Sequence, residues 1–340
     1  MANTKLTNAR KAKNDEFYTQ LSDIEKEMSY YKKHFYGKKI FLNCDDPETS
    51  YFWQYFAAFF DEYQLEKLTS THYHPTEPTY KLEIVRGKDI NGDGKMDGKD
   101  LVKTPLLGNG DFRSAECIEL LDEADIVITN PPFSLFREYI ALLVEHNKKF
   151  ITIGNLNAIT YKEIFPLLQQ NKLWFGATCF KGGAAYFIAP QELYEPEKMS
   201  NPKHAYMENG VFYWRVNGVR WYTNLDIDKR HDKLPLWKDY EGNETDYPEY
   251  DNYAAIEVGK VAEIPCDYFG VMGVPVSFMD KYCPEQFRII GADFDLAGPV
   301  IVDGKEKPNP QRLYVDGRRL YSRILIQRIE QPENQDTEEE

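Results

Sequence analysis

Short apolar runs separated by polar turns dominate the first half of the chain, and expected strands alternate there with expected helices. The expected strands are 39–43, 67–72, 125–129 and 149–153. The expected helices are 23–35, 51–63, 115–124 and 136–146. This alternation predicts an α/β fold with an open, mostly parallel sheet, in which ligands bind beyond the carboxyl ends of the strands.

From about residue 201 the pattern changes to short strands in sequence rich in Tyr, Trp, Asn, Asp and Gly. Two alternating runs, 211–216 and 219–223, flank Asn217-Gly218, and an Asn-Gly pair in this position predicts a β-hairpin. We therefore expect a first domain at 1–200 with an insertion near 85–105, and a second region at 201–328 whose last strand is 320–328. The acidic tail 329–340 is too polar to pack and is expected to be disordered.

The composition is that of a folded protein. The 340 residues exceed what one hydrophobic core usually organises, and 42% of them are hydrophobic and 14% aromatic. There is no apolar run of the roughly 18 to 20 residues that a membrane span needs and no signal-peptide core, so we expect a cytoplasmic protein without a membrane partner. Five scattered cysteines without a C-x-x-C pair predict reduced thiols, not a zinc site or a disulfide framework.

The charge balance argues against a nucleic-acid partner when it is taken alone. With 41 Lys and Arg against 55 Asp and Glu, the net charge is -14, whereas affinity for DNA comes largely from neutralising phosphates. Much of the acid lies in the tail after residue 329 and in 89–100. A local basic face is therefore still compatible with the sequence.

The strongest chemical motif is the run Asp-Ile-Val-Ile-Thr-Asn-Pro-Pro-Phe at 125–133, in which an apolar strand leads directly into Asn130, Pro131, Pro132 and Phe133. An exocyclic amine that has been flipped out of a duplex needs acceptors for its two N–H groups, and an Asn oxygen and a backbone carbonyl provide them. Two prolines fix a rigid turn, and Phe133 offers a ring on which a base stacks. The alternative is a structural strand-to-helix turn with Phe133 in the core.

A second motif, at 89–100, has the spacing of a calcium loop. Oxygen ligands would come from the first, third, fifth, seventh, ninth and twelfth positions, with the seventh ligand a backbone carbonyl. These positions are Asp89, Asn91, Asp93, Lys95, Asp97 and Asp100. The twelfth residue is Asp instead of the usual bidentate Glu, and a Gly-Asp surface turn is the alternative interpretation.

Residues 13–19, 125–133 and 270–282 together resemble the EcoRI-type adenine-specific DNA methyltransferase family, and the resemblance covers nearly the whole chain. It implies a Rossmann-like S-adenosylmethionine-dependent methyltransferase fold, with a smaller mixed C-terminal target-recognition region. It further implies transfer of a methyl group to N6 of a flipped adenine in duplex DNA, without a covalent intermediate. In the segment Asn-Asp-Glu-Phe-Tyr-Thr, the family resemblance assigns cofactor contacts to Asp15, Phe17, Tyr18 and Thr19, and the alternative is a cap of the following helix.

The loop after the first strand, Asn-Cys-Asp-Asp-Pro at 43–47, lacks the Gly-rich turn of most amino-methyltransferases. Asp45 or Asp46, with Asn43, would then meet the cationic amino group and ribose of the cofactor. The alternative is that Asp46 and Thr49 cap the helix that begins near residue 51.

The loop at 108–114 resembles the one that follows the third strand of related enzymes. That resemblance makes Asp111 the acceptor for the adenine amine of the cofactor and Phe112 its stacking partner. The alternative is that Asp111 or Ser114 caps the helix near residue 115.

Duplex DNA is the expected partner, and basic and aromatic residues of the C-terminal half are the candidates for contacting it. They are Arg215, Arg220, Trp221, Arg312, Arg318, Arg319 and Arg323. Other acceptors for the same chemistry are RNA adenine, N4 of cytosine and a protein glutamine, and a non-catalytic nucleic-acid-binding protein on this fold is a further alternative. The resemblance leaves open whether a companion restriction endonuclease exists.

Overall fold

The computed structural model describes residues 19–44, 46–180, 184–188 and 205–329. Asp15, Phe17, Tyr18 and Asp45, like the tail from residue 330, lie outside the described residues. The chain divides into two compact units. Unit 1 comprises the described residues of 1–165 and 173–227, and unit 2 comprises 166–172 and the described residues from 228 onward.

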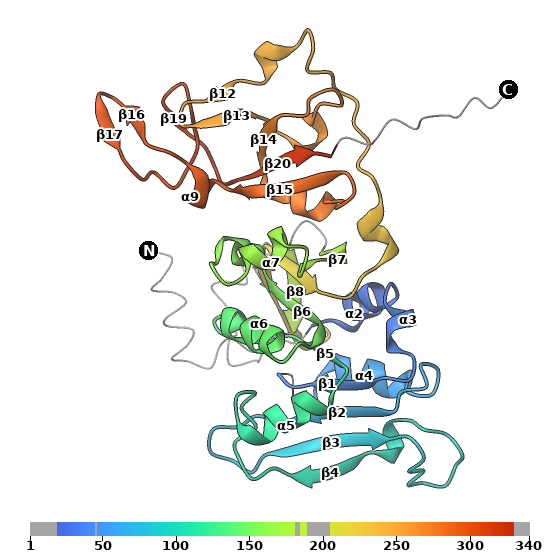
Figure 1. The fold of residues 1–340 in the computed structure, drawn as a ribbon. Helices are drawn as coiled ribbons and strands as arrows, with labels where there is room; N and C mark the ends of the chain where they lie inside the picture. Colours follow the sequence, from blue (N-terminus) through green and yellow to red (C-terminus); the bar gives the residue numbers. More distant parts are fainter. Residues whose placement is uncertain (1–18, 45, 181–183, 189–204, 330–340) are drawn as a thin grey trace, which may run out of the picture. The chain divides into compact units, whose positions relative to one another are not determined.

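Unit 1 is built on an eight-stranded mixed sheet with the order β4-β3-β2-β1-β5-β6-β11-β7 (Figure 1). Its strands are β1 (Lys39–Leu42), β2 (Lys67–Thr71), β3 (Tyr80–Val85), β4 (Val102–Pro105), β5 (Ile126–Thr129), β6 (Lys149–Asn155), β7 (Trp174–Cys179) and β11 (Val219–Thr223). The four central strands β2, β1, β5 and β6 are parallel, as the alternating pattern predicted. The antiparallel pairs on both flanks were not predicted.

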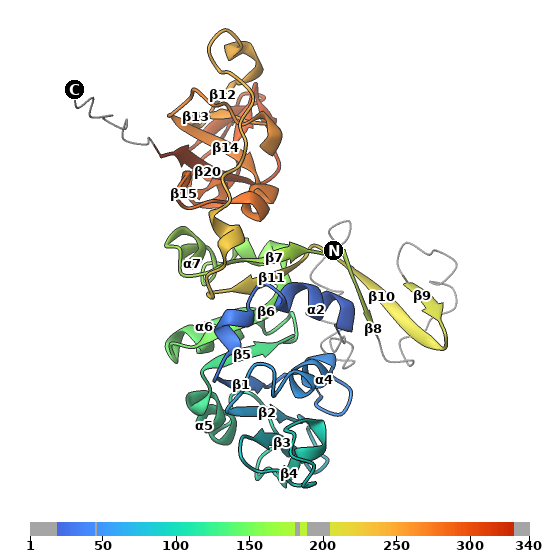
Figure 2. The same cartoon turned by 90° about the vertical axis from the view of Figure 1, so that its right-hand side faces the viewer.

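Helices lie on both faces of this sheet, with α2 and α4 on one face and α5 and α6 on the other (Figure 2). The α-helices in the described part of unit 1 are α2 (Leu21–Met28), α3 (Lys32–Phe35), α4 (Tyr51–Ala58), α5 (Ala115–Glu123) and α6 (Phe136–Glu145). Helix α7 (Phe165–Gln169) begins at the last residue of 1–165 and otherwise belongs to unit 2. The helix expected at 23–35 is therefore two helices, α2 and α3, separated by a turn.

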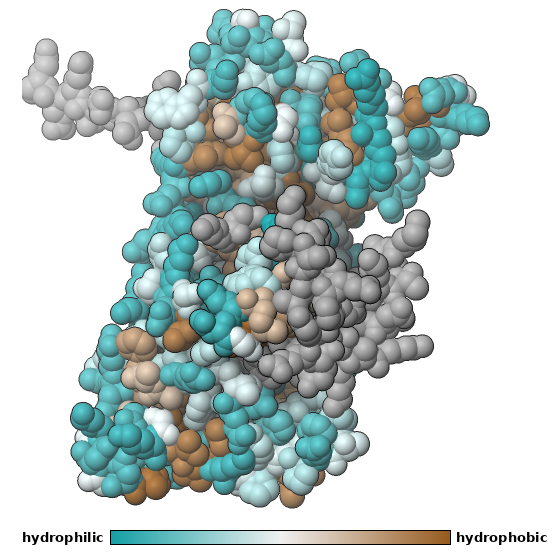
Figure 3. Space-filling view, turned by 180° about the vertical axis from the view of Figure 1, so that it is seen from behind, coloured by the Kyte–Doolittle hydropathy of each residue, from teal (hydrophilic) through white to brown (hydrophobic). Residues whose placement is uncertain are grey.

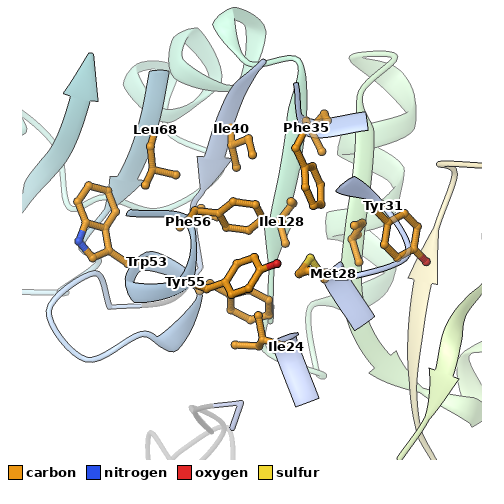
Figure 4. Packing of buried hydrophobic residues seen from close by; sticks show 14 of the residues in the cluster. Ile24, Met28, Tyr31, Phe35, Ile40, Trp53, Tyr55, Phe56, Leu68 and Ile128 are labelled. Atoms are coloured by element: carbon orange, nitrogen blue, oxygen red, sulfur yellow. The ribbon is translucent and has the colours of Figure 1, made fainter. Parts of the chain in front are cut away.

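The core of unit 1 forms where α2 and α4 pack on the sheet (Figure 4). Met28 of α2 and Phe56 of α4 are fully buried against sheet residues such as Ile40 and Ile128. Helix α2 is also held to β7 by the buried Glu27, whose carboxylate accepts hydrogen bonds from the backbone amides of Ala177 and Thr178, both at 2.7 Å. These contacts fix the scaffold on which the loops at the carboxyl edge of the sheet stand.

A second, three-stranded sheet in unit 1 has the order β8-β10-β9 (Figure 2). Its strands are β8 (Ala184–Ile188), β9 (Ala205–Glu208) and β10 (Val211–Asn217). The hairpin expected around Asn217-Gly218 is wrong, because β10 pairs with β8 and β9 whereas β11 pairs with β6 and β7. Gly218 has the positive φ of +70° that the sequence suggested, but it joins two sheets instead of two paired strands. Since β11 lies inside the large sheet, unit 1 continues to Ile227 and does not end at the boundary of residue 200 expected from the pattern.

Unit 2 contains a five-stranded sheet with the order β12-β13-β14-β20-β15. Its strands are β12 (Glu249–Tyr250), β13 (Tyr253–Glu257), β14 (Val271–Pro275), β15 (Phe287–Ala292) and β20 (Arg323–Arg328). Two small hairpins, β16 (Val300–Val302) with β17 (Lys305–Lys307) and β18 (Tyr314–Val315) with β19 (Arg318–Arg319), follow the short helix α9 (Asp293–Leu296). The 3-10 helices of the described chain include η1 (Gly98–Asp100), η2 (Leu156–Thr160), η5 (Asp228–His231), η6 (Glu244–Asp246), η7 (Val261–Glu263) and η8 (Val276–Lys281). No helix in the described ranges is long and apolar enough to cross a membrane.

Candidate active site

The carboxyl ends of β1 and β5 form the centre of the candidate site. The chain leaves β1 for β2 on one side and later returns to place β5 on the other side, so β1 and β5 flank the topological switch point where α/β sheets bind ligands. Strand β1 leads into Asn43 and β5 leads into Asn130. The backbone amide of Cys44 donates a hydrogen bond of 3.1 Å to the Thr129 hydroxyl, which ties the two loops together.

The loop from Asn130 to Phe133 connects β5 to α6 by a tight turn. Asn130 is only 8% exposed. The Pro132 carbonyl accepts from the Leu135 amide at 2.8 Å, whereas the Pro131 carbonyl takes part in no backbone–backbone hydrogen bond among the described residues. Of the two proline carbonyls, that of Pro131 is therefore the one left for a ligand by the turn.

Phe133 combines features of both interpretations of this loop. Its ring is half-buried against the core of unit 1 and lies edge-on to the Phe187 ring, with centroids 6.2 Å apart. Because part of the ring remains exposed, packing against the core does not prevent it from stacking on a ligand.

Asn43 is fixed by a residue that the sequence did not single out. The Tyr139 hydroxyl of α6 donates a hydrogen bond to the side-chain oxygen of Asn43. The Tyr139 ring in turn lies edge-on to Phe112, with centroids 5.2 Å apart and planes at 84°. Asn43 is 2% exposed, and its side-chain nitrogen has no hydrogen-bond partner in the described part of the chain.

Asp46 lies in the turn between β1 and α4. Its carboxylate accepts from the Glu48 amide at 2.9 Å, and its other oxygen lies 3.5 Å from His72 Nδ1 at the end of β2. The N-cap of α4 is Ser50, whose hydroxyl accepts from the Phe52 amide at 3.1 Å. The alternative that Asp46 and Thr49 cap this helix is therefore wrong, and Asp46 faces the end of β2.

Asp111 is held in an ion pair. Its carboxylate accepts from the backbone amide and guanidinium of Arg113 at distances down to 2.6 Å, and the same guanidinium reaches Glu138 at 3.1 Å. Hydrogen bonding to Arg113 lowers the pKa of the Asp111 carboxyl, so this carboxylate stays ionised. Ser114 caps α5, because its hydroxyl accepts from the Cys117 amide, so Asp111 is not the cap.

The 108–114 loop lies directly against the end of β2. Gly110 has φ +73°, and a Cβ there would come within 2.3 Å of the His72 carbonyl oxygen, so this close approach requires glycine. The loop follows the antiparallel edge strand β4, which is the fourth strand along the chain and not the third. Phe112 is 5% exposed beside Tyr139, so most of its ring is already packed.

The expected calcium loop is not supported by the structure. Its side-chain oxygens bind the backbone amides of the same loop: Asp89 accepts from Gly92 and Gly94, Asn91 from Asp93, Asp93 from Lys95, Asp97 from Lys99, and Asp100 from Ile90, Asn91 and Asp97. Among the described residues, the carboxylate, thiol and imidazole groups close enough to share an ion are those of Asp239, Cys266 and Asp267, outside this loop. The segment is a surface turn whose acids satisfy its own amides.

The chain matches the family model described as adenine-specific methyltransferase EcoRI over residues 5–329. It belongs to this family. It is 44% identical to the Type II methyltransferase M.EcoRI of Escherichia coli over 95% of this chain and 96% of the relative. It is 38% identical to M.MpnI of Mycoplasma pneumoniae over 94% of this chain and 96% of the relative, and 38% identical to M.MgeORF184P of Mycoplasma genitalium over 94% and 97%. No solved structure matches the chain.

An adenine-specific methyltransferase of this family uses S-adenosylmethionine, and two observations fit that cofactor. The buried Nδ2 of Asn43 and Oγ1 of Thr19 have no hydrogen-bond partner in the part of the chain that the structure describes, which costs free energy unless a ligand supplies one. Asp46 and Asp111 place carboxylates in the loops after β1 and β4, and the cofactor carries a cationic amino group and a sulfonium.

Three of the residues expected to contact DNA in this methyltransferase are engaged elsewhere. Trp221 is 1% exposed in the core of unit 1, and Arg220 is 8% exposed with its guanidinium on the Val219 carbonyl. Arg323 pairs with both oxygens of Glu257, with distances from 2.5 to 3.0 Å. A sequence without tertiary context cannot distinguish these buried side chains from exposed ones, because strand pairing decides which face is covered.

Proposed function

We propose that this enzyme methylates N6 of an adenine that has been extruded from duplex DNA, and that Asn130–Phe133 is its catalytic loop. The observation that carries the proposal is the position of this loop: it follows β5 at the switch point, beside Asn43 and the Tyr139 hydroxyl that holds it. The relatives' description as Type II methyltransferases supports DNA as the substrate.

Asn130 and Pro131 would provide the acceptors for the target amine. The Asn130 side-chain oxygen accepts one N–H of the exocyclic amine, and the Pro131 carbonyl accepts the other. Both interactions draw electron density onto the nitrogen and orient its lone pair, so catalysis here consists of positioning and electrostatics. Pro132 contributes by fixing the turn that leaves the Pro131 carbonyl available, and the exposed part of the Phe133 ring receives the face of the base.

S-adenosylmethionine would be held by the loops around Asn43 and Asp111 and supplies the methyl group. Asn43 donates through its unpartnered Nδ2, Asp46 accepts from cationic or hydroxyl groups, and Asp111 accepts from an amine. Phe112 provides an apolar wall. Thr19 is buried with an unpartnered hydroxyl, which supports the contact that the family resemblance assigns to it, and the resemblance extends the same role to Asp15, Phe17, Tyr18 and Asp45.

Three of the five cysteines have a raised thiol pKa, which favours the protonated, unreactive form. Burial raises the pKa of Cys117 and of Cys283, and a hydrogen bond to Asp239 raises that of Cys266. Because the thiolate is the nucleophilic form, these shifts argue against Cys117, Cys266 and Cys283 as covalent nucleophiles. This is in keeping with direct transfer to the amine.

The test is to incubate the purified enzyme with methyl-labelled S-adenosylmethionine and, separately, with duplex DNA, RNA or protein, and to identify the labelled product after digestion. Label in N6-methyladenine from duplex DNA supports the proposal. Label in N4-methylcytosine, in RNA or in methylglutamine would replace it with the corresponding alternative. Cofactor binding without transfer to any acceptor would favour a non-catalytic nucleic-acid-binding protein.

We further propose that this enzyme belongs to a restriction-modification system, because the relatives are named Type II methyltransferases. In such a setting a companion endonuclease cleaves the same unmethylated site. DNA treated with this enzyme and S-adenosylmethionine should then resist a nuclease encoded beside its gene, while untreated DNA is cut. Equal cleavage of both DNAs would contradict the pairing.

A further inference from the structure

We propose that the two hairpins of unit 2, β16–β17 and β18–β19, form a groove-reading surface for duplex DNA, and that Asp251 and Asn252 position it. This inference rests on the proposed function, since it assumes that the substrate is duplex DNA. It goes further by assigning recognition to particular side chains and to the residues that hold them in place.

The segment that contains the two hairpins is basic within an acidic chain. Residues 300–319 contain five Lys and Arg against three Asp and Glu, whereas the whole chain carries a net charge of -14. The excess of positive charge comes from Arg312, Arg318 and Arg319, because Lys305 and Lys307 of the first hairpin are balanced by Asp303 and Glu306. A protein of this overall charge needs such a local concentration of positive charge to bind a polyphosphate. Lys305 and Lys307 of β17 and Arg318 and Arg319 of β19 are all exposed.

Both hairpins have the same tight turn. Asp303-Gly304 and Asp316-Gly317 each have positive φ at both residues, between +49° and +72°, as a two-residue type I′ turn requires. In each hairpin a basic residue follows the glycine directly, so the positive charges lie on the returning strand. A two-stranded ribbon of this kind is narrow enough to enter the major groove.

The two hairpins meet at Tyr314. Lys307 of β17 lies with Nζ 3.4 Å from the Tyr314 hydroxyl and 5.3 Å from the centre of its ring. Tyr314 is the cross-strand partner of Arg319 in β18–β19. Tyr314 therefore links the two hairpins, because it contacts Lys307 of β17 and is paired with Arg319 of β19.

Asn252 is the residue that fastens both hairpins to the sheet of unit 2. Its side-chain nitrogen donates to the Gly298 and Arg312 carbonyls at 2.9 and 3.0 Å, and its side-chain oxygen accepts from the Tyr314 amide at 3.1 Å. Gly298 precedes the first hairpin, and Arg312 and Tyr314 begin the second. One buried amide side chain therefore fixes the entry to both hairpins.

Asp251 fixes the tip of the second hairpin. Its two carboxylate oxygens accept from the Asp316 and Gly317 amides, at 3.1 and 2.8 Å, and its own amide donates to the Tyr314 carbonyl at 2.8 Å. Arg318 follows this turn directly. A turn held by a neighbouring carboxylate loses little conformational freedom on binding, so Arg318 and Arg319 are preorganised for a groove.

The surface around these hairpins has the character of a DNA-binding face and not of an apolar protein interface. Seen from behind, the hairpin end of unit 2 is mostly hydrophilic with scattered apolar residues (Figure 3). Ile301 of β16 is an exposed apolar side chain, with 70% of its surface accessible. Arginines on a ribbon recognise guanine edges by bidentate hydrogen bonds and phosphates by charge. Arg312 is less available, because it lies 3.7 Å from the buried carboxylate of Asp293.

The test begins with the wild-type enzyme and a random-sequence duplex library, in which mapped N6-methyladenines define the cognate site. Binding to the cognate duplex is then measured as a function of salt for R318A/R319A and K305A/K307A. The charge-matched control is R288A/K260A, because both residues are exposed and lie outside the two hairpins. Arg288 is on β15, at the edge of the sheet opposite β12, whereas β18 contacts β12. Each hairpin variant should weaken binding about tenfold or more and lower the salt slope by about one to two, while the control stays within about twofold.

Three further variants separate base reading from charge and position. R318K/R319K keeps the charge but loses the bidentate geometry, so it should keep the salt slope and relax the mapped site. D251N keeps one of the two acceptor oxygens that hold the turn, so the ratio of cognate to non-cognate binding should fall moderately. N252A removes two donated hydrogen bonds and one accepted hydrogen bond, so this ratio should fall strongly. S-adenosylmethionine affinity should be unchanged in both.

Each negative result has a distinct meaning. If the hairpin variants bind DNA as the control does while the wild type still makes N6-methyladenine, the groove-reading surface is overturned and the proposed function stands. If the arginine variants lose binding but D251N and N252A keep the full cognate ratio, the positioning role of Asp251 and Asn252 is overturned. If the wild type makes no methyladenine, the proposed function itself fails.

Discussion

The Tyr139 hydroxyl donates a hydrogen bond to the side-chain oxygen of Asn43, and this contact joins the helix after the catalytic loop to the loop after β1. It fixes which end of the Asn43 amide faces Tyr139, so that the amide nitrogen is the atom left without a partner in the described residues. Because Tyr139 also packs against Phe112, one side chain organises the residues proposed to hold the cofactor.

Replacing Tyr139 with Phe should weaken cofactor binding while leaving the fold intact. The ring still packs on Phe112, but Asn43 loses a hydrogen bond that contributes about 0.5 to 1.5 kcal/mol, which corresponds to roughly a two- to twelvefold higher Kd. Calorimetric titration with S-adenosylmethionine measures this. Tyr31→Phe is the matched control, because its buried hydroxyl bonds Glu27 at 2.8 Å and should affect stability only. Equal cofactor affinity in wild type and Tyr139→Phe would contradict the role given to this contact.

The Asp111 and Arg113 pair predicts a particular pH dependence of stability. Since Arg113 lowers the pKa of Asp111 in the folded state, the pair stabilises the protein above the unfolded pKa of about 3.9, and this contribution is lost as the pH falls through the lower folded value. The difference in unfolding free energy between wild type and Asp111→Asn should therefore shrink on acidification from pH ~6 to ~3. Urea denaturation across this pH range measures this difference. A difference in unfolding free energy that grows as the pH falls would contradict the stabilising role given to the pair.

Phe133 separates a stacking role from a purely structural one. If the exposed part of its ring receives the base, Phe133→Ala should lower kcat/KM for DNA by about five- to 160-fold, given stacking of roughly 1 to 3 kcal/mol, and Phe133→Tyr should retain most activity. Thermal denaturation of both variants controls for the contact with Phe187. A large loss of stability with unchanged activity per folded molecule would place Phe133 in the core alone.

The loop at 89–100 should bind no calcium. Its carboxylates already accept from the loop's own amides, and Asp100 alone accepts from Ile90, Asn91 and Asp97. Calorimetric titration of the enzyme with calcium should give no binding heat and no change in thermal midpoint. Asp100→Ala should destabilise the protein, because three amides lose their acceptor. A saturable calcium isotherm that disappears in Asp100→Ala would reverse this conclusion.

Local patterns predicted the centre of the fold and the loops of the site. The strands ending at Asn43 and Asn130 are short apolar runs that lead into polar turns, and both the strands and their common edge could be foreseen from that pattern. The cap of α5 by Ser114 is also local and was one of the two caps expected there, whereas α4 is capped by Ser50 and not by Asp46 or Thr49. What could be predicted was therefore what a few consecutive residues determine.

The remaining features depend on partners far away in the sequence. Asn217-Gly218 has the backbone of a turn, but its flanking strands find better partners in two different sheets. Arg323 has the sequence context of a surface arginine until Glu257 pairs with it. Tyr139 occupies a position on the apolar stripe of α6, so nothing in the sequence separates its hydroxyl contact with Asn43 from ordinary core packing.

The most direct test of the central claim is a comparison of wild type, Asn130→Ala and Asn130→Asp in two assays: S-adenosylmethionine binding by calorimetry, and formation of N6-methyladenine in duplex DNA. We expect both variants to bind the cofactor with nearly wild-type affinity. Asn130→Ala should lose methylation almost completely, whereas Asn130→Asp, which keeps an acceptor oxygen, should retain more of it. Wild-type methylation by folded Asn130→Ala would contradict the assignment of Asn130–Phe133 as the catalytic loop.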